Sequence, residues 1–101
     1  MMRIETSQGI LSVLLPAECL IYEVEAHALL LKAVDWDSLE FSTVAVGAGD
    51  VLAVDTAYFQ LLLSVRQTAR EYGKAFCLND AGEALADIAR LYGIHIAEQI
   101  S

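Results

Sequence analysis

The chain has 101 residues, of which 56% are hydrophobic and 20% are charged, and 14 Asp and Glu against 6 Lys and Arg give a net charge of −8. Because a chain of this length supports one core, we expect residues 1–101 to form a single domain. The acidic balance argues against a nucleic-acid partner, since phosphate binding relies on clustered Lys and Arg. The sequence has neither a run of about 20 apolar residues nor the layout of a signal peptide, so we expect no membrane insertion and a cytoplasmic location.

The first elements are expected to be a hairpin and a helix. Residues 2–7 and 10–15 are short runs with apolar side chains on either side of Gln8-Gly9, and glycine tolerates the positive φ of a tight turn. Pro16 suits the first turn of a helix. Apolar side chains then recur every three or four positions and predict the buried face of this helix: Leu20, Val24, Ala28, Leu31 and Val34.

A strand and a second helix are expected next. Residues 41–46 are apolar and β-branched enough for a strand buried on both faces, and residues 47–50 form a loop. Asp55 is placed to cap a helix that runs to Tyr72 and stops at Gly73, a residue suited to the left-handed end of a helix. The apolar spacing predicts that this helix buries Tyr58, Leu62, Val65, Ala69 and Tyr72.

The last strand and helix complete the fold. Residues 74–78 read as a strand, and Asp80 with Glu83 three positions later is typical of a capping box at a helix start. The third helix is expected to bury Ala81, Leu85, Ile88 and Tyr92. Because the later strands alternate with helices, we expect an α/β fold with a mixed β-sheet, parallel core strands and helices outside.

The sequence offers little that suggests catalysis. The loop at Gly47-Ala48-Gly49 lacks the third glycine of a nucleotide-binding fingerprint, because Leu52 stands at that position, so an ordinary turn is expected. His27 and His95 lie far apart without neighbours at ligand spacing, and we expect both on the surface or at helix ends. The sequence therefore predicts a protein that is not an enzyme, with no cofactor, no metal and no catalytic residue.

The cysteines and the acidic residues also have simple interpretations. Cys19 and Cys77 stand alone without a CxxC pattern, so buried, reduced thiols are expected. Acidic side chains gather on and after the first helix, at Glu18, Glu23, Glu25, Asp35, Asp37 and Glu40. They form either a solvated face or an acidic docking surface for a basic partner.

The position that stands out is Asp55-Thr56-Ala57, where the end of a strand meets the start of a helix. In one interpretation Asp55 caps the helix and Thr56 makes only local hydrogen bonds. In the other, Thr56 is phosphorylated, because a phosphate with a charge of about −1.5 to −2 is favoured at the positive end of a helix. The residues alone leave both interpretations open.

The same segment carries a resemblance to a known family. Val54-Asp55-Thr56-Ala57 is followed by the apolar run 59–63, then by Gly73-Lys74 and Phe76-Cys77-Leu78. In this order and at these lengths the chain resembles the STAS domains, the family of the anti-sigma-factor antagonists, over nearly its whole length. Residues 15–19 and 21–22 further resemble the small single-domain STAS proteins associated with chemotaxis signalling.

The resemblance implies a non-enzymatic signalling module that binds a protein partner, either a serine/threonine-type kinase or a chemotaxis regulator. In the family, the Ser or Thr directly after the Asp is phosphorylated by a partner kinase, which abolishes binding, and Thr56 occupies that position. The implied partner surface comprises Asp55, Thr56, Tyr58 and Phe59. The chain departs from the family pattern at two positions. Tyr58 stands where the family has a glycine, either as an exposed aromatic anchor or as a core residue, and the acidic residue that commonly ends the central strand in the family falls near Gly47. The alternative is the STAS subunit of an ABC-type lipid transporter, bound to its ATPase.

Overall fold

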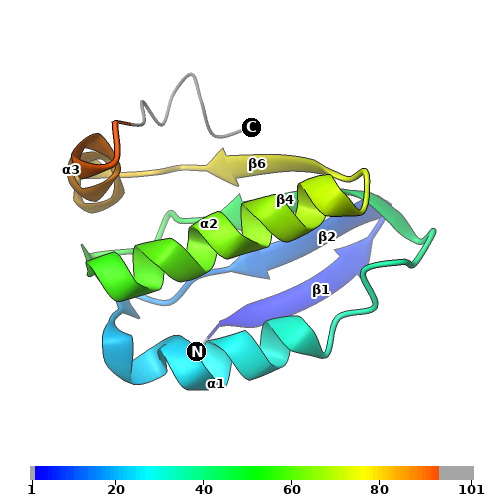
Figure 1. Ribbon diagram of the computed structural model, residues 1–101, viewed down its shortest axis with the longest axis horizontal. Coiled ribbons are helices and arrows are strands. Elements are labelled where there is room, and N and C mark those ends of the chain that lie inside the picture. Colours follow the sequence, from blue (N-terminus) through cyan, green and yellow to red (C-terminus); the bar gives the residue numbers. More distant parts are fainter. Residues whose placement is uncertain (1, 94–101) are drawn as a thin grey trace.

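A layer of strands with two helices lying across it forms the body of the molecule (Figure 1). The computed structural model describes residues 2–93. The strands are β1 (Arg3–Ser7), β2 (Gly9–Leu14), β3 (Glu18–Cys19), β4 (Phe41–Gly47), β5 (Ala53–Val54) and β6 (Ala75–Asn79). The helices are α1 (Ile21–Lys32), α2 (Thr56–Glu71) and α3 (Glu83–Leu91).

The main sheet has the strand order β1-β2-β4-β6 and is mixed, as expected. β1 and β2 form the antiparallel hairpin, with Gln8 and Gly9 at φ values of 54° and 79° in the turn. β2, β4 and β6 run parallel, which confirms the α/β fold class. In β4, Val44 and Val46 are fully buried, whereas Thr43 and Ala45 are half-buried. The prediction that this strand is buried on both faces is therefore right for one face and only partly right for the other.

A second, two-stranded sheet was not predicted. β3 and β5 pair in parallel, with Glu18 opposite Ala53 and Cys19 opposite Val54. The segment after Pro16 therefore enters a strand, and α1 begins at Ile21 rather than in the turn that starts at Pro16. The fixed φ of proline is as compatible with an extended segment as with a first helical turn. Pro16 alone therefore does not show whether a strand or a helix follows it.

α2 provides the largest share of the helical core. Asp55 caps it and Gly73 follows its end with a φ of 70°, both as predicted. Four residues of the predicted stripe are buried, but Tyr72 is 45% exposed. Phe59, near the start of α2, is buried although it lies outside the predicted stripe, and its ring lies 5.2 Å from that of Tyr92 at the end of α3.

α3 differs from its predicted start. Asp80 has a φ of 59° and does not cap the helix, whose N-cap is Gly82 without a side-chain hydrogen bond. Leu85 and Ile88 are buried as expected, whereas Tyr92 is 38% exposed. α3 contacts β5 and α2, so it covers the end of the molecule at which α2 begins.

Candidate functional site

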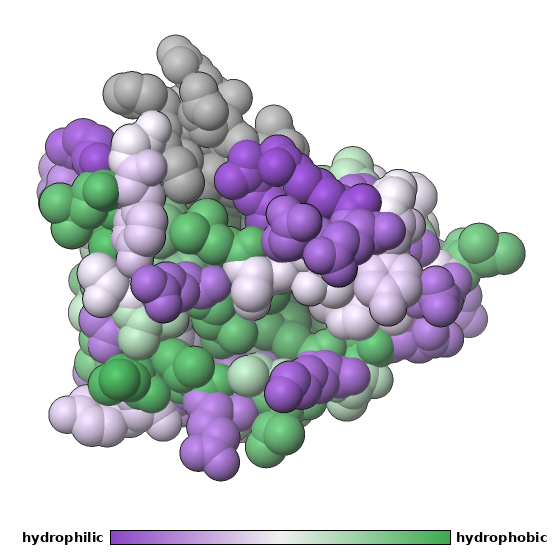
Figure 2. Space-filling model, viewed as in Figure 1, coloured by the Kyte–Doolittle hydropathy of each residue, from purple (hydrophilic) through white to green (hydrophobic). Residues whose placement is uncertain are grey.

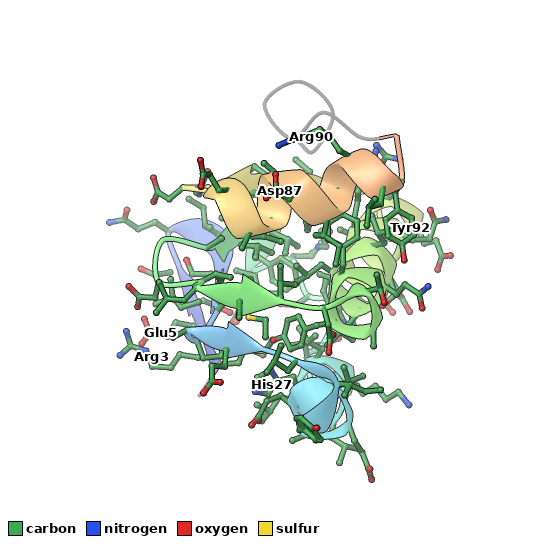
Figure 3. The ribbon with its side chains drawn as sticks, turned by 90° about the vertical axis from the view of Figure 1, so that its left-hand side faces the viewer. Arg3, Glu5, His27, Asp87, Arg90 and Tyr92 are labelled. Atoms are coloured by element: carbon green, nitrogen blue, oxygen red, sulfur yellow. The ribbon has the colours of Figure 1, made fainter. Side chains whose placement is uncertain are left out.

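The start of α2 lies beside the start of α1. β3 leads into α1 and β5 leads into α2, and because β3 and β5 are paired in parallel, both helices begin at the same end of the molecule (Figure 1). Figure 3 looks onto this end. Each helix start carries a partial positive charge from its unpaired N–H groups, so the two starts together favour a negatively charged group.

Asp55 joins the two helix starts. Its Oδ1 accepts a hydrogen bond of 2.9 Å from the backbone N–H of Tyr58 in the first turn of α2. Its Oδ2 accepts a hydrogen bond of 2.7 Å from the backbone N–H of Ile21, the first residue of α1. The N-cap position of α1 itself is Leu20, which has no side-chain acceptor. One carboxylate therefore caps both helices.

Thr56 is the first residue of α2 and is exposed to solvent. Within residues 2–93 its hydroxyl makes no side-chain hydrogen bond, in contrast to the hydroxyls of Ser64 and Thr68 on the same helix, which donate to backbone carbonyls. The Thr56 hydroxyl is therefore accessible from outside, at the end where the two helix starts converge.

The two aromatic residues expected in the partner surface lie elsewhere. Tyr58 has no exposed surface, which agrees with its predicted place on the buried stripe of α2 and decides between the two alternatives in favour of a core residue. Phe59 is 1% exposed, so it does not form the exposed contact that was expected of it. Tyr58 follows Thr56 by two positions, so the helical repeat turns its side chain to the opposite, inward face of α2. Phe59, three positions after Thr56, is buried and packs against Tyr92 at the end of α3. Since Tyr58 points inward, its ring does not crowd the Thr56 hydroxyl.

A buried polar cluster lies beneath the site. His27, on α1, is fully buried, and a hydrogen bond of 2.5 Å joins its Nδ1 to the hydroxyl of Tyr58 on α2. Cys19 of β3 is also fully buried; its thiol donates a hydrogen bond of 3.4 Å to the backbone carbonyl of Pro16 and interacts with the same Tyr58 hydroxyl. The rings of His27 and Tyr58 meet edge to face, with centroids 5.5 Å apart. The cluster ties β3, α1 and α2 together directly behind the helix starts.

Burial keeps the members of this cluster uncharged. It raises the pKa of Cys19 to about 11, with a further rise from the Asp55 and Glu23 carboxylates and an opposing effect from the Tyr58 hydrogen bond. Burial also raises the pKa of Tyr58 and lowers that of His27. His27 and Tyr58 are therefore joined by a hydrogen bond between two neutral groups. The other ring nitrogen of His27, Nε2, has no hydrogen-bond partner and lies 3.6 Å from a carboxylate oxygen of Glu23.

The burial of His27 contradicts the prediction of a surface or helix-end histidine, and His95 lies outside the described residues. A signal for His27 was present in the sequence, because it follows Val24 by three positions and precedes Leu31 by four, on the buried face of α1. Cys19 is buried as expected, whereas Cys77 is half-buried, and both are free thiols. The acidic side chains near α1 are exposed, apart from a half-buried Glu23.

Two other kinds of site are absent from the part of the chain that the structure describes. Among residues 2–93, no group of three or more His, Cys, Asp or Glu is placed to hold a metal ion. No helix in this part of the chain is long and apolar enough to cross a membrane.

Comparison with known proteins identifies the fold. A solved structure titled "Structure of the Anti-Sigma Factor Antagonist SpoIIAA in its Unphosphorylated Form" matches with a TM-score of 0.70, over 90% of this chain and 83% of that chain, at 13% sequence identity. The chain has the STAS fold. No protein-family model matches the sequence, and no curated protein matches it significantly. The likeness is thus one of structure, and it confirms the expected STAS architecture with its mixed sheet.

Proposed function

We propose that this chain is a non-enzymatic signalling module of the anti-sigma-factor-antagonist type, which binds a regulatory protein partner through the start of α2 and is switched by phosphorylation of Thr56. The observation that carries the proposal is the exposed Thr56 hydroxyl at the convergence of two helix starts, directly after the Asp55 cap. The STAS fold supports it, because the similar solved structure is that of an anti-sigma-factor antagonist in its unphosphorylated form.

The switch requires a partner kinase. The kinase transfers the γ-phosphoryl group of ATP to Oγ1 of Thr56, with ADP as the leaving group and loss of the hydroxyl proton. The product adds about −1.5 to −2 charges and three acceptor oxygens beside the Asp55 carboxylate. The helix starts stabilise part of this charge, but a partner that packs closely on Thr56 must desolvate it, which costs several kcal/mol when no cation compensates. Phosphorylation therefore releases the partner.

The partner contact is centred on Thr56, with Asp55 positioning it rather than touching the partner, because both carboxylate oxygens are engaged in capping. Tyr58 and Phe59 do not touch the partner; they pack in the core and hold the start of α2, and with it Thr56, in position. The partner class that fits is a cytoplasmic serine/threonine-type kinase or a chemotaxis regulator, which would place this protein in the cytoplasm.

The proposal is tested by affinity capture from the native cytosol with four forms of the protein: wild type, Thr56→Ala, Thr56→Glu and the control Thr6→Glu. Thr6 is an exposed threonine on the edge strand β1, so the control adds the same charge away from the site. We expect a kinase or regulator to be retained by wild type, Thr56→Ala and Thr6→Glu and lost with Thr56→Glu. Retention of one partner, such as a transporter ATPase, by all four forms would contradict the switch.

A further inference from the structure

α1 has a second apolar face that no part of residues 2–93 covers. His27 and Leu31 point into the core, yet on the opposite side Tyr22 is 87% exposed and Leu29 is 61% exposed. Ala26 and Ala33 are exposed along the same line. We call Tyr22, Ala26, Leu29 and Ala33 the α1 outer stripe. Figure 2 shows hydrophobic residues along the lower edge of the molecule, where α1 lies, with hydrophilic residues between them.

The spacing of the α1 outer stripe is that of a helix that packs on another helix. Its members are separated by four, three and four positions, which is the repeat of alternating d and a positions in a heptad. A helix that is apolar on both sides is typical of one with neighbours on both sides. α1 has its inner neighbour in α2, so the outer stripe predicts an outer helical neighbour.

The side-chain sizes along the stripe favour a second copy of α1 in the antiparallel direction. In such a pair, each d position of one helix faces an a position of the other. Tyr22 then meets Ala33 of the second copy, and Leu29 meets Ala26 of the second copy, so that every large side chain faces a small one. A parallel pair would instead set Tyr22 against Tyr22 and Ala26 against Ala26.

The charges beside the stripe agree with the same arrangement. Glu25 and Lys32 both lie at g positions along one side of the stripe, seven residues apart. In an antiparallel pair the g positions face each other, so Glu25 of each copy meets Lys32 of the other. In a parallel pair, Glu25 would face the e position, which is Leu30. Size and charge are thus complementary only in the antiparallel direction.

We propose that the α1 outer stripe is the twofold-symmetric contact of a homodimer of this chain. The contact is short, because the 12 residues of α1 extend over about 18 Å. It therefore buries less than the roughly 1,200–2,000 Å² of a standard stable interface, and a dissociation constant in the micromolar range or weaker is expected. The net charge of −8 on each copy also opposes association at low ionic strength. This inference does not depend on phosphorylation of Thr56.

The first test is sedimentation equilibrium over protein concentrations from low micromolar to millimolar, at physiological ionic strength. The forms are wild type, Leu29→Asp and the control Leu39→Asp, because Leu39 is 98% exposed and lies outside α1. Circular dichroism confirms that each form is folded. We expect a reversible monomer–dimer equilibrium for wild type and the control, and at least about tenfold weaker association for Leu29→Asp. A wild type that stays monomeric throughout, or a Leu29→Asp form that dimerises as tightly as wild type, would overturn the proposal.

The second test addresses the direction of the helices. Glu25→Lys alone and Lys32→Glu alone each place like charges opposite each other, so each single variant should dimerise several-fold more weakly than wild type. When the two variants are mixed, each Lys of one faces a Glu of the other, and a heterodimer of near wild-type affinity should form. If the two variants associate with each other no more tightly than each associates with itself, the antiparallel arrangement is contradicted.

Binding of a basic amphipathic helix to a wild type that stays monomeric would assign the α1 outer stripe to a different partner.

Discussion

Replacement of Asp55 by alanine tests whether one carboxylate holds two helix starts. The change removes the acceptors of the hydrogen bonds from Tyr58 N–H and Ile21 N–H, at 2.9 and 2.7 Å. Loss of a cap costs about 1 kcal/mol, within a range of about 0.5–2 kcal/mol. Because the two bonds serve different helices, we expect Asp55→Ala to lower the free energy of unfolding by about 2 kcal/mol, which corresponds to about 8 °C or more in Tm.

Urea denaturation and thermal unfolding measure this effect, with Asp50→Ala as the control. Asp50 is exposed and, within residues 2–93, makes no side-chain hydrogen bond, so its removal should change stability by less than about 0.5 kcal/mol. Asp55→Asn keeps one acceptor oxygen and should lose about half as much as Asp55→Ala. If Asp55→Ala unfolds at the same urea concentration as wild type, the double cap does not stabilise the fold and the reasoning fails.

Three further predictions concern the buried cluster. Tyr58→Phe leaves Nδ1 of His27 buried without a partner and should destabilise the protein by about 1–3 kcal/mol in urea denaturation; an unchanged midpoint would show that the bond contributes nothing. Because burial lowers the pKa of His27, the unfolded state binds more protons below about pH 6.5. Stability should therefore fall as the pH drops from 7 to 5, by at most about 1.4 kcal/mol per pH unit from this group, and His27→Gln should flatten that slope; equal slopes would contradict the assignment. Burial raises the pKa of Cys19 to about 11, so iodoacetamide at pH 8 should modify it far more slowly than the half-buried Cys77 in the native protein, but equally fast in urea. Equal native rates, measured by peptide mass spectrometry, would refute this.

The parts of the fold that follow local rules were predictable from the sequence. Asp55 and Gly73 mark the ends of α2 because an N-cap acceptor and a left-handed residue act within one turn of the helix. Gln8-Gly9 marks the hairpin turn for a similar reason. These signals depend on the conformations open to single residues, so no knowledge of distant contacts was needed.

The parts that depend on distant contacts were not predictable in the same way. β3 and β5 have two residues each, too few for any periodicity, and they form only because Glu18-Cys19 pairs with Ala53-Val54. The second hydrogen bond of Asp55 is accepted from Ile21, 34 positions away, so the sequence could not predict that Asp55 caps two helices. The burial of Phe59 depends on where α3 packs against the start of α2. Within the candidate site, the position of Thr56 was predicted, but the inward direction of Tyr58 was left open.

The most direct test of the proposed switch uses protein that carries phosphothreonine at position 56, installed during synthesis and verified by mass spectrometry. Its affinity for the captured partner is compared by isothermal titration with that of the unphosphorylated protein and with protein phosphorylated at Thr6. The account predicts that the phosphate on Thr56 weakens binding at least about a hundredfold, which corresponds to about 2.7 kcal/mol, while the phosphate on Thr6 has little effect. Equal affinity of the Thr56-phosphorylated and unphosphorylated forms would contradict it.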